Sequence, residues 1–224
     1  MKTILKRIKN KLFKKNKLTK KEQRHKLVGS AKSWKLKQDF QIAFLLNQGL
    51  KVDDKFLDLG CGTLRGGIPI INYLNEGHYY GIDVRKDVLV EGKKELKQEG
   101  LAHKNPKLIS FDNFGELELN ETFDVIFAFS VLIHLEDSIL ENCLHFVSRH
   151  LNSSGKFMAN VNIGERPKGS WLEFPVMFKP IEFYEELAQK AGLSVTQMGT
   201  IKSLGHHSND ELSNNQIMLQ FRKL

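Results

Sequence analysis

The chain has 224 residues, a net charge of +8, 41% hydrophobic residues and 27% charged residues. These values suit one globular domain with a sizeable core and a short extension. Its two cysteines, Cys61 and Cys143, are too few for a disulfide framework, which excludes the disulfide-stapled secreted class. No apolar run approaches the length needed to span a bilayer, so we expect a cytoplasmic protein.

The positive charge is concentrated near the N-terminus. Residues 1–27 contain ten lysines and two arginines against one acid, so the rest of the chain is slightly acidic. In a helix, lysines would surround an apolar face of Met1, Ile4, Leu5, Ile8 and Leu12. Such a segment suits peripheral binding to an anionic membrane at its inner face, a nucleic acid or another acidic partner, or a solvated tail. We therefore divide the chain into a basic amphipathic extension, 1–29, and a domain, 30–224.

Residues 56–67 predict a short apolar strand, a glycine turn and the first turn of a helix. Gly60 and Gly62 allow the backbone to pass close to a ligand, because glycine has no Cβ atom. Asp58 places a carboxylate near the unpaired N–H groups of the new helix. The dinucleotide fingerprint expects a third glycine three residues after Gly62, where Arg65 stands instead. The motif therefore predicts a nucleoside-binding turn that differs from the usual NAD-binding one.

A second strand, over residues 79–84, ends near an acid, Asp83, that lies 23 residues after Gly60. In doubly wound folds an acid at about this distance accepts hydrogen bonds from ribose hydroxyls. With these residues the chain resembles the class I S-adenosylmethionine-dependent methyltransferases, whose first motif commonly reads acid-x-Gly-x-Gly-x-Gly. Asp58, Gly60 and Gly62 fit this motif, and Leu64 occupies its last glycine position.

The resemblance covers residues 51–224 and implies an α/β fold of the bacterial small-molecule type. The expected sheet is Rossmann-like and doubly wound, mostly parallel with an antiparallel last strand, and has helices on both faces. Further helices are predicted over 30–49, 66–74, 86–100, 137–151 and 182–191, and further strands over 107–111, 122–130, 157–163, 193–201 and 216–221. The implied cofactor is S-adenosyl-L-methionine, and the implied activity is that of a methyltransferase.

The cofactor is expected along the carboxyl edge of the sheet. The residues implied to bind it are Asp58, Gly60, Cys61, Gly62, Arg65, Asp83, Val84, Asp112, Asn113, Phe129 and Ser130. A carboxylate such as Asp112 can accept a hydrogen bond from the exocyclic amine of adenine. The Asp112-Asn113 pair is also a common turn sequence, and that interpretation stays open.

The acceptor is expected beside the cofactor, where three distant segments meet. The candidate residues are Trp34, Lys37, Gln41, Trp171, His206 and His207. In related methyltransferases the helix over 30–49 covers the cofactor mouth, although Trp34 would equally suit sealing the domain edge. Residues 164–180, which are rich in proline and aromatic residues, predict an ordered cover over the acceptor.

Histidine residues supply the candidate base. His134 follows the fourth strand at the carboxyl edge, where open α/β folds bind ligands, and histidine has a suitable pKa for general-base catalysis. The alternative is that His134 orients its loop or caps the next helix. His206, His207 and Asp210 are metal-ligand types, but adjacent histidines point in different directions, so we expect no metal site.

Three functions remain open from the sequence. The first is methyl transfer to a hydroxyl or amine of a small molecule, such as a sugar or a precursor of a surface glycan. The second is a nucleic-acid or protein methyltransferase recruited by the basic extension. The third is a non-catalytic adaptor with the S-adenosylmethionine-binding fold, against which the intact Gly60, Gly62 and Asp83 argue.

Overall fold

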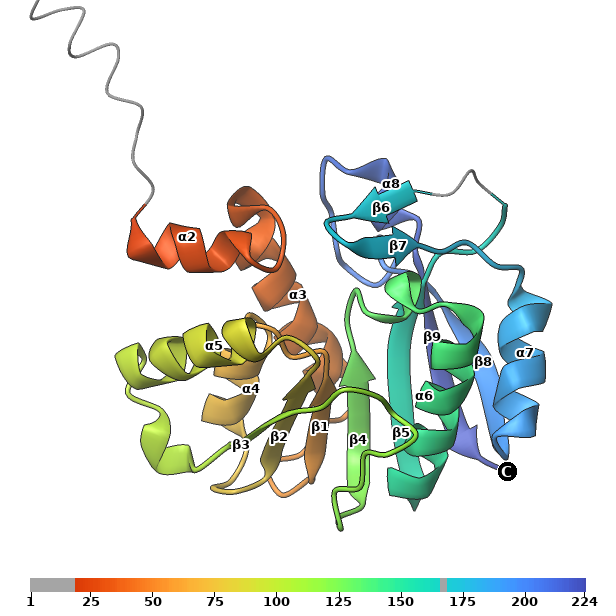
Figure 1. The fold of residues 1–224 in the computed structure, drawn as a ribbon, viewed down its shortest axis with the longest axis horizontal. Coiled ribbons are helices and arrows are strands. Elements are labelled where there is room, and N and C mark those ends of the chain that lie inside the picture. The colour runs from red at the N-terminus through yellow and green to blue at the C-terminus, as the bar shows by residue number, and fades with distance from the viewer. Residues whose placement is uncertain (1–18, 166–168) are drawn as a thin grey trace, which may run out of the picture.

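A seven-stranded sheet forms the centre of the structure, a computed structural model that describes residues 19–165 and 169–224 (Figure 1). The strands, in their order across the sheet, are β3 (Lys107–Ser110), β2 (Tyr79–Asp83), β1 (Phe56–Leu59), β4 (Phe123–Ala128), β5 (Leu151–Val161), β9 (Ile217–Lys223) and β8 (Leu193–Thr200). Neighbours from β3 to β5 pair in parallel, and β9 runs antiparallel to both β5 and β8. The predicted doubly wound α/β fold with an antiparallel last strand is confirmed.

Helices cover both faces of this sheet. The α-helices are α2 (Lys20–Lys26), α3 (Trp34–Asn47), α4 (Gly67–Tyr73), α5 (Lys86–Gln98), α6 (Asp137–His150), α7 (Ile181–Lys190) and α8 (Glu211–Asn214), and the 3-10 turns are η1 (Ala31–Ser33), η2 (Ala102–Lys104) and η3 (Leu132–His134). One core packs α6 and α7 on the sheet, and a second core packs α3, α4 and α5 on the opposite face. Because both faces are covered, the inner strands are apolar on both sides.

The carboxyl edge of the parallel strands collects segments that are distant in the sequence. Strands β6 (Gly169–Trp171) and β7 (Phe174–Val176) form an antiparallel hairpin there, and Figure 1 shows it above the end of β5. Met177 N–H donates to the Ile133 carbonyl at 2.8 Å, which fastens the hairpin to η3. The expected ordered cover is therefore partly a two-stranded sheet.

The described part of the N-terminal extension packs on the domain. Thr19 and Glu22 form a capping box at the start of α2. Arg24 is buried and pairs with Glu91 at 3.2 Å and with Glu95, both on α5. The apolar face proposed for residues 1–12 lies outside the described residues. No helix in the described part of the chain has the length and apolar character to cross a membrane.

Candidate active site

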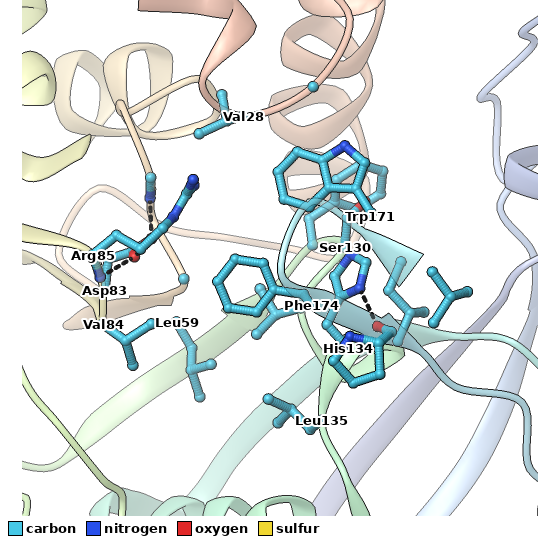
Figure 2. A pocket seen from close by; sticks show the side chains of 18 of the residues that line it. Val28, Leu59, Asp83, Val84, Arg85, Ser130, His134, Leu135, Trp171 and Phe174 are labelled. Atoms are coloured by element: carbon cyan, nitrogen blue, oxygen red, sulfur yellow. Dashed lines mark hydrogen bonds and ion pairs between the residues drawn. The ribbon is translucent and has the colours of Figure 1, made fainter. Parts of the chain in front are cut away.

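A cavity of about 540 Å³ opens at the carboxyl edge of the sheet. Many of the predicted residues line it, namely Lys37, Gly60, Gly62, Arg65, Asp83, Val84, Asp112, Asn113, Phe129, Ser130, His134 and Trp171. In Figure 2, Asp83 and Arg85 lie on one side of the cavity, and His134 and Trp171 lie on the other. The fold thus brings the proposed cofactor and acceptor residues to one space.

The glycine turn after β1 presents backbone to this cavity. Gly60 has a φ of +74° and Gly62 a φ of +54°, which side chains rarely adopt. A Cβ atom on Gly60 would lie 2.4 Å from Cγ2 of Val131, and one on Gly62 would lie 2.7 Å from Cγ1 of Val28. Both the backbone conformation and the close neighbours therefore require glycine at these two positions.

Leu64 keeps the left-handed backbone that a glycine would adopt at the last position of the motif, with a φ of 63°. Its side chain is fully buried between α4 and α5. A Cβ atom on Gly67 would lie 2.9 Å from Cδ2 of Leu64, and one on Gly92 would lie 3.1 Å from its Cγ. The turn accommodates leucine because its neighbours on both helices are small.

Asp83 joins the end of β2 to the turn. Its Oδ2 accepts a hydrogen bond from Gly62 N–H at 2.9 Å, and its Oδ1 accepts one from Arg85 N–H at 2.9 Å (Figure 2). Burial raises the pKa of Asp83, and these hydrogen bonds and the Arg85 guanidinium oppose that rise. Each carboxylate oxygen can accept more than one hydrogen bond, so the side chain can still serve a ribose hydroxyl pair.

Asp58 and Cys61 are not among the residues that line the cavity, so their direct contact with the cofactor stays a prediction. Asp58 lies inside the sheet and accepts a hydrogen bond from Tyr79 Oη at 2.6 Å. Burial raises the pKa of Asp58 to about 7. The Cys61 thiol is buried against Gly81, and burial raises its pKa as well. These side chains support the turn from within the sheet.

The segment after β3 forms one end of the cavity. Phe111 and Phe114 line it with ring centroids 4.7 Å apart, next to Asp112 and Asn113. Asn113 Oδ1 accepts a hydrogen bond from Glu116 N–H at 3.0 Å, so this side chain also stabilises the turn. An apolar wall beside a carboxylate suits a purine that carries an exocyclic amine.

Buried amides that the sequence analysis missed hold the turn after β4. Ser130 has a φ of 62°, and its N–H donates to Asn160 Oδ1 at 2.7 Å. Asn160 donates to Gln216 at 2.6 Å, Gln216 donates to Asn162 at 3.1 Å, and Asn162 donates to the Met177 carbonyl at 3.0 Å. Asn162 and Gln216 line the cavity. Amides inside or beside apolar strand segments were the available signal, because a buried amide needs partners.

His134 enters the cavity from η3, opposite the turn. Its Nδ1 lies 2.7 Å from the Pro175 carbonyl oxygen. A carbonyl only accepts, so Nδ1 carries the proton and Nε2 presents a lone pair. Burial lowers the pKa of His134, the charges of Lys37 and Arg85 act in the same direction, and the hydrogen bond to Pro175 opposes them. The neutral ring therefore predominates near neutral pH.

Two aromatic rings of the hairpin flank this histidine. The ring centroids of Trp171 and Phe174 lie 5.6 Å and 6.1 Å from that of His134. The guanidinium of Arg85 lies 5.8 Å from the Trp171 centroid and 5.7 Å from the Phe174 centroid, within the range of cation–π contact. Arg85 also donates to the Leu27 carbonyl at 3.1 Å. Arg85, which the sequence analysis missed, therefore connects the end of β2 with the hairpin, and its position directly after that strand was the available signal.

Lys37 lines the cavity, but several other acceptor candidates do not: Trp34, Gln41, His206 and His207. Trp34 stacks on His25 with ring centroids 3.5 Å apart, and so seals the contact between α2 and α3. Gln41 donates to the Lys37 carbonyl of its own helix at 3.0 Å. His206 is fully buried against Phe40, and His207 is exposed. The structure therefore does not bring these four side chains to the cavity, and their contact with an acceptor stays a prediction. In the described residues, no cluster of three or more His, Cys, Asp or Glu is placed to hold a metal ion.

The sheet order, the glycine turn and the acid after β2 together define a nucleoside-binding α/β domain. Residues 57–157 match the family model described as "Methyltransferase domain". A probable methyltransferase, ltbC, of Aspergillus luteorubrus is 32% identical over 91 residues, which are 39% of this chain and 32% of that protein. The alignments span about a third of the length of the curated relatives.

Solved methyltransferase structures share the fold over most of the chain. An S-adenosylmethionine-dependent methyltransferase from Clostridium acetobutylicum superposes with a TM-score of 0.63 at 18% identity, covering 85% of this chain and 92% of that one. The magnesium protoporphyrin IX methyltransferase of Synechocystis, solved with bound S-adenosylhomocysteine, gives a TM-score of 0.66 at 12% identity over 96% and 92% of the chains. Over residues 57–157 the chain is therefore similar to methyltransferase domains, and it shares the fold of S-adenosylmethionine-dependent methyltransferases. The predicted fold class is confirmed, and the family model agrees with the predicted resemblance to methyltransferases.

Proposed function

We propose that this chain transfers the methyl group of S-adenosyl-L-methionine to a hydroxyl or amine of a small-molecule acceptor. The observation that carries the proposal is the fixed tautomer of His134, whose Nδ1 is bound to Pro175 O at 2.7 Å. Its Nε2 lone pair belongs to a ring that lines the same cavity as Asp83 and the glycine turn. A base and a nucleoside site sharing one cavity fit group transfer from a nucleoside cofactor.

Methyl transfer from a sulfonium requires mainly that the acceptor atom, the methyl carbon and the sulfur be aligned. The acceptor oxygen or nitrogen forms a bond to the methyl carbon, the carbon–sulfur bond breaks with its electrons moving to sulfur, and the acceptor proton passes to a base. Positioning of this kind can supply roughly 7–11 kcal/mol of the barrier. Asp83 and the turn would hold the nucleoside, and His134 Nε2 would accept the proton.

The walls of the cavity support a compact acceptor with a flat or ring-shaped face. The volume, about 540 Å³, lies in the range of small-molecule sites, roughly 300–1,000 Å³. Trp171 and Phe174 offer aromatic faces, which suit the ring of a sugar or a surface-glycan precursor. One structurally similar protein is named a magnesium protoporphyrin IX methyltransferase, and another is named a glycopeptide N-methyltransferase. Both names support an acceptor other than a nucleic acid. Binding of residues 1–27 to an anionic membrane stays a prediction.

The proposal is tested by labelling. The protein is incubated with a cell extract and cofactor carrying a tritiated methyl group, and the products are separated by size. Label in the low-molecular-mass fraction is expected, whereas label confined to protein or nucleic acid would support the macromolecular alternative. Calorimetry with S-adenosylmethionine and S-adenosylhomocysteine is the matching control, because binding of neither would remove the enzyme function.

A further inference from the structure

Two basic side chains face the cavity where α3 meets the glycine turn. Lys37 of α3 and Arg65, which follows the turn, both line it. The Lys37 ammonium makes no hydrogen bond or ion pair with the residues that the structure describes. Arg65 donates through Nη1 to the Val28 carbonyl at 2.9 Å, and its buried Nε has no acceptor within the described ranges. Neither cation is therefore paired with a carboxylate here.

The charges around Lys37 leave an excess of positive charge. Burial lowers the pKa of Lys37 to about 8, and the nearby charge of Arg65 acts in the same direction. Asp210 is the acid that opposes this, but its Oδ1 already accepts a hydrogen bond from Ser213 N–H at 3.3 Å at the start of α8. Burial likewise lowers the pKa of Arg65 to about 10, and the nearby buried Asp58, whose own pKa is raised to about 7, opposes this shift. Unpaired charge in a largely desolvated place is unfavourable, so an anion from a ligand would stabilise this arrangement.

We infer that the acceptor is an acid, whose carboxylate or phosphate group binds between Lys37 and Arg65. This inference rests on the proposed function and names its substrate class. Arginine and lysine both suit such a group, and the guanidinium of arginine can bind two of its oxygens at once.

The surroundings of Lys37 favour the acceptor as the source of this anion. Burial lowers the pKa of His134 in η3 and of His206 in the β8–β9 connection, and the nearby charge of Lys37 acts in the same direction on both. Asp210 also lies in that connection. The ammonium therefore lies near the proposed base. Asp112, which marks the expected adenine end of the cofactor, instead belongs to the segment after β3, at the edge strand of the sheet. An acid held by Lys37 would place its own hydroxyl or amine close to His134.

The test compares ligands that differ in charge alone or nearly so. With the protein saturated by S-adenosylhomocysteine, calorimetry or ligand-observed NMR would compare glucuronate with glucuronamide, glucose 6-phosphate with glucose, and 4-hydroxybenzoate with 4-hydroxybenzamide. At least one acid should bind about tenfold more tightly than its neutral partner, a difference of about 1.4 kcal/mol. Lys37→Met should abolish this preference, and Lys37→Arg should retain it.

A matched control lies on the same helix. Lys35 has a side chain that is 74% exposed and pairs with Asp39, so Lys35→Met removes the same charge outside the cavity and should leave the preference unchanged. Equal binding of acid and neutral partner in all three pairs by the wild type would overturn the inference.

A second measurement separates the acceptor from the cofactor, which has a carboxylate of its own. The Lys37→Met variant should bind S-adenosylhomocysteine and 5′-methylthioadenosine, which lacks the amino-acid part, as tightly as the wild type does. If the variant loses affinity for the first compound alone, Lys37 holds the cofactor and the acidic-acceptor assignment is wrong. Failure of the wild type to bind either compound would instead remove the proposed function itself.

Discussion

The two sides of the cavity are built in different ways. The ribose end of the proposed cofactor side comes from one β1–α4–β2 unit, where Gly62 N–H and the Asp83 carboxylate, 21 residues apart, meet at 2.9 Å. The acceptor side gathers side chains from η3, the hairpin and α3, and its hydrogen bond from His134 to Pro175 O joins residues 41 positions apart. Local backbone shape therefore determines the first side, whereas long-range packing determines the second. Substitutions on the cofactor side should therefore change cofactor affinity, and substitutions on the acceptor side should change turnover.

The largest expected effect is that of His134→Ala on turnover. Loss of a general base lowers the rate by roughly 10²–10⁴-fold, while affinity for S-adenosylhomocysteine should not change because His134 lies on the acceptor side. Single-turnover transfer of labelled methyl to the identified acceptor measures the rate, and calorimetry measures the affinity for S-adenosylhomocysteine. His145→Ala on α6 is the control, since His145 does not line the cavity. An unchanged rate would dismiss His134 as the base.

The same residue predicts a pH dependence. Only neutral imidazole accepts a proton, and burial lowers the pKa of His134 below its ordinary value of 6.5. Activity should therefore be present at neutral pH and be lost as the pH falls through that lowered pKa. The rate of the wild type, measured across acidic and neutral buffers with saturating cofactor, should show this single loss. A midpoint above the ordinary histidine value would contradict the assignment.

Asp83→Ala should affect the cofactor side of the cavity and lower the affinity for the cofactor. Losing a charged partner of the ribose, together with the hydrogen bond to Gly62, should weaken cofactor binding by about 1–3 kcal/mol, which is roughly 5- to 150-fold in affinity. Calorimetry with S-adenosylhomocysteine measures this loss. Asp87→Ala, an exposed acid in the first turn of α5, should bind normally. A change within experimental error for Asp83→Ala would mean that the ribose is held elsewhere.

Asn160→Leu tests the amides that lie between the two sides. The variant leaves the Ser130 N–H and the side-chain Oε1 of Gln216 without their partner, and Asn160 is fully buried. We expect the free energy of unfolding to fall by about 1–3 kcal/mol, measured in urea, with a lower turnover because the turn after β4 shifts. Asn72→Leu on α4, at an exposed position, should change neither quantity. Unaltered stability would show that these amides rearrange at no cost.

The smallest effect is expected for Arg85→Met, which breaks the contact between the two sides. Cation–π pairs at partly exposed sites contribute about 0.5–1 kcal/mol, so the KM for the acceptor should rise a few-fold, and Arg85→Lys should show less of this rise. Steady-state kinetics with the acceptor measures it. If the KM does not change, Arg85 does not couple the end of β2 to the hairpin.

Much of the fold and part of the candidate site could be predicted from the sequence. Gly60, Gly62 and Asp83 could be predicted because a glycine turn and an acid at the end of the next strand have local signatures. His206 could not be placed, because nothing in its neighbours shows that Phe40, far earlier in the chain, buries its ring at 5.2 Å. The amide series from Ser130 to Met177 was missed for the same reason. Its members pair across strands, and spacing along the chain does not reveal which strands are neighbours.

Leu64 shows how this family motif can change without losing its shape. A left-handed non-glycine residue costs about 1–2 kcal/mol, and a fully buried leucine side chain regains about 1.5–3 kcal/mol, so the exchange is close to neutral. The volume it occupies is offered by Gly67 and Gly92. Relatives that restore glycine at position 64 should then tolerate alanine at position 92, whereas relatives with leucine should not; position 67 should stay glycine in both, because a Cβ atom there would lie 2.5 Å from Tyr79 Oη. Steric compensation between positions 64 and 92 would mark a subgroup that a search for three successive glycines overlooks.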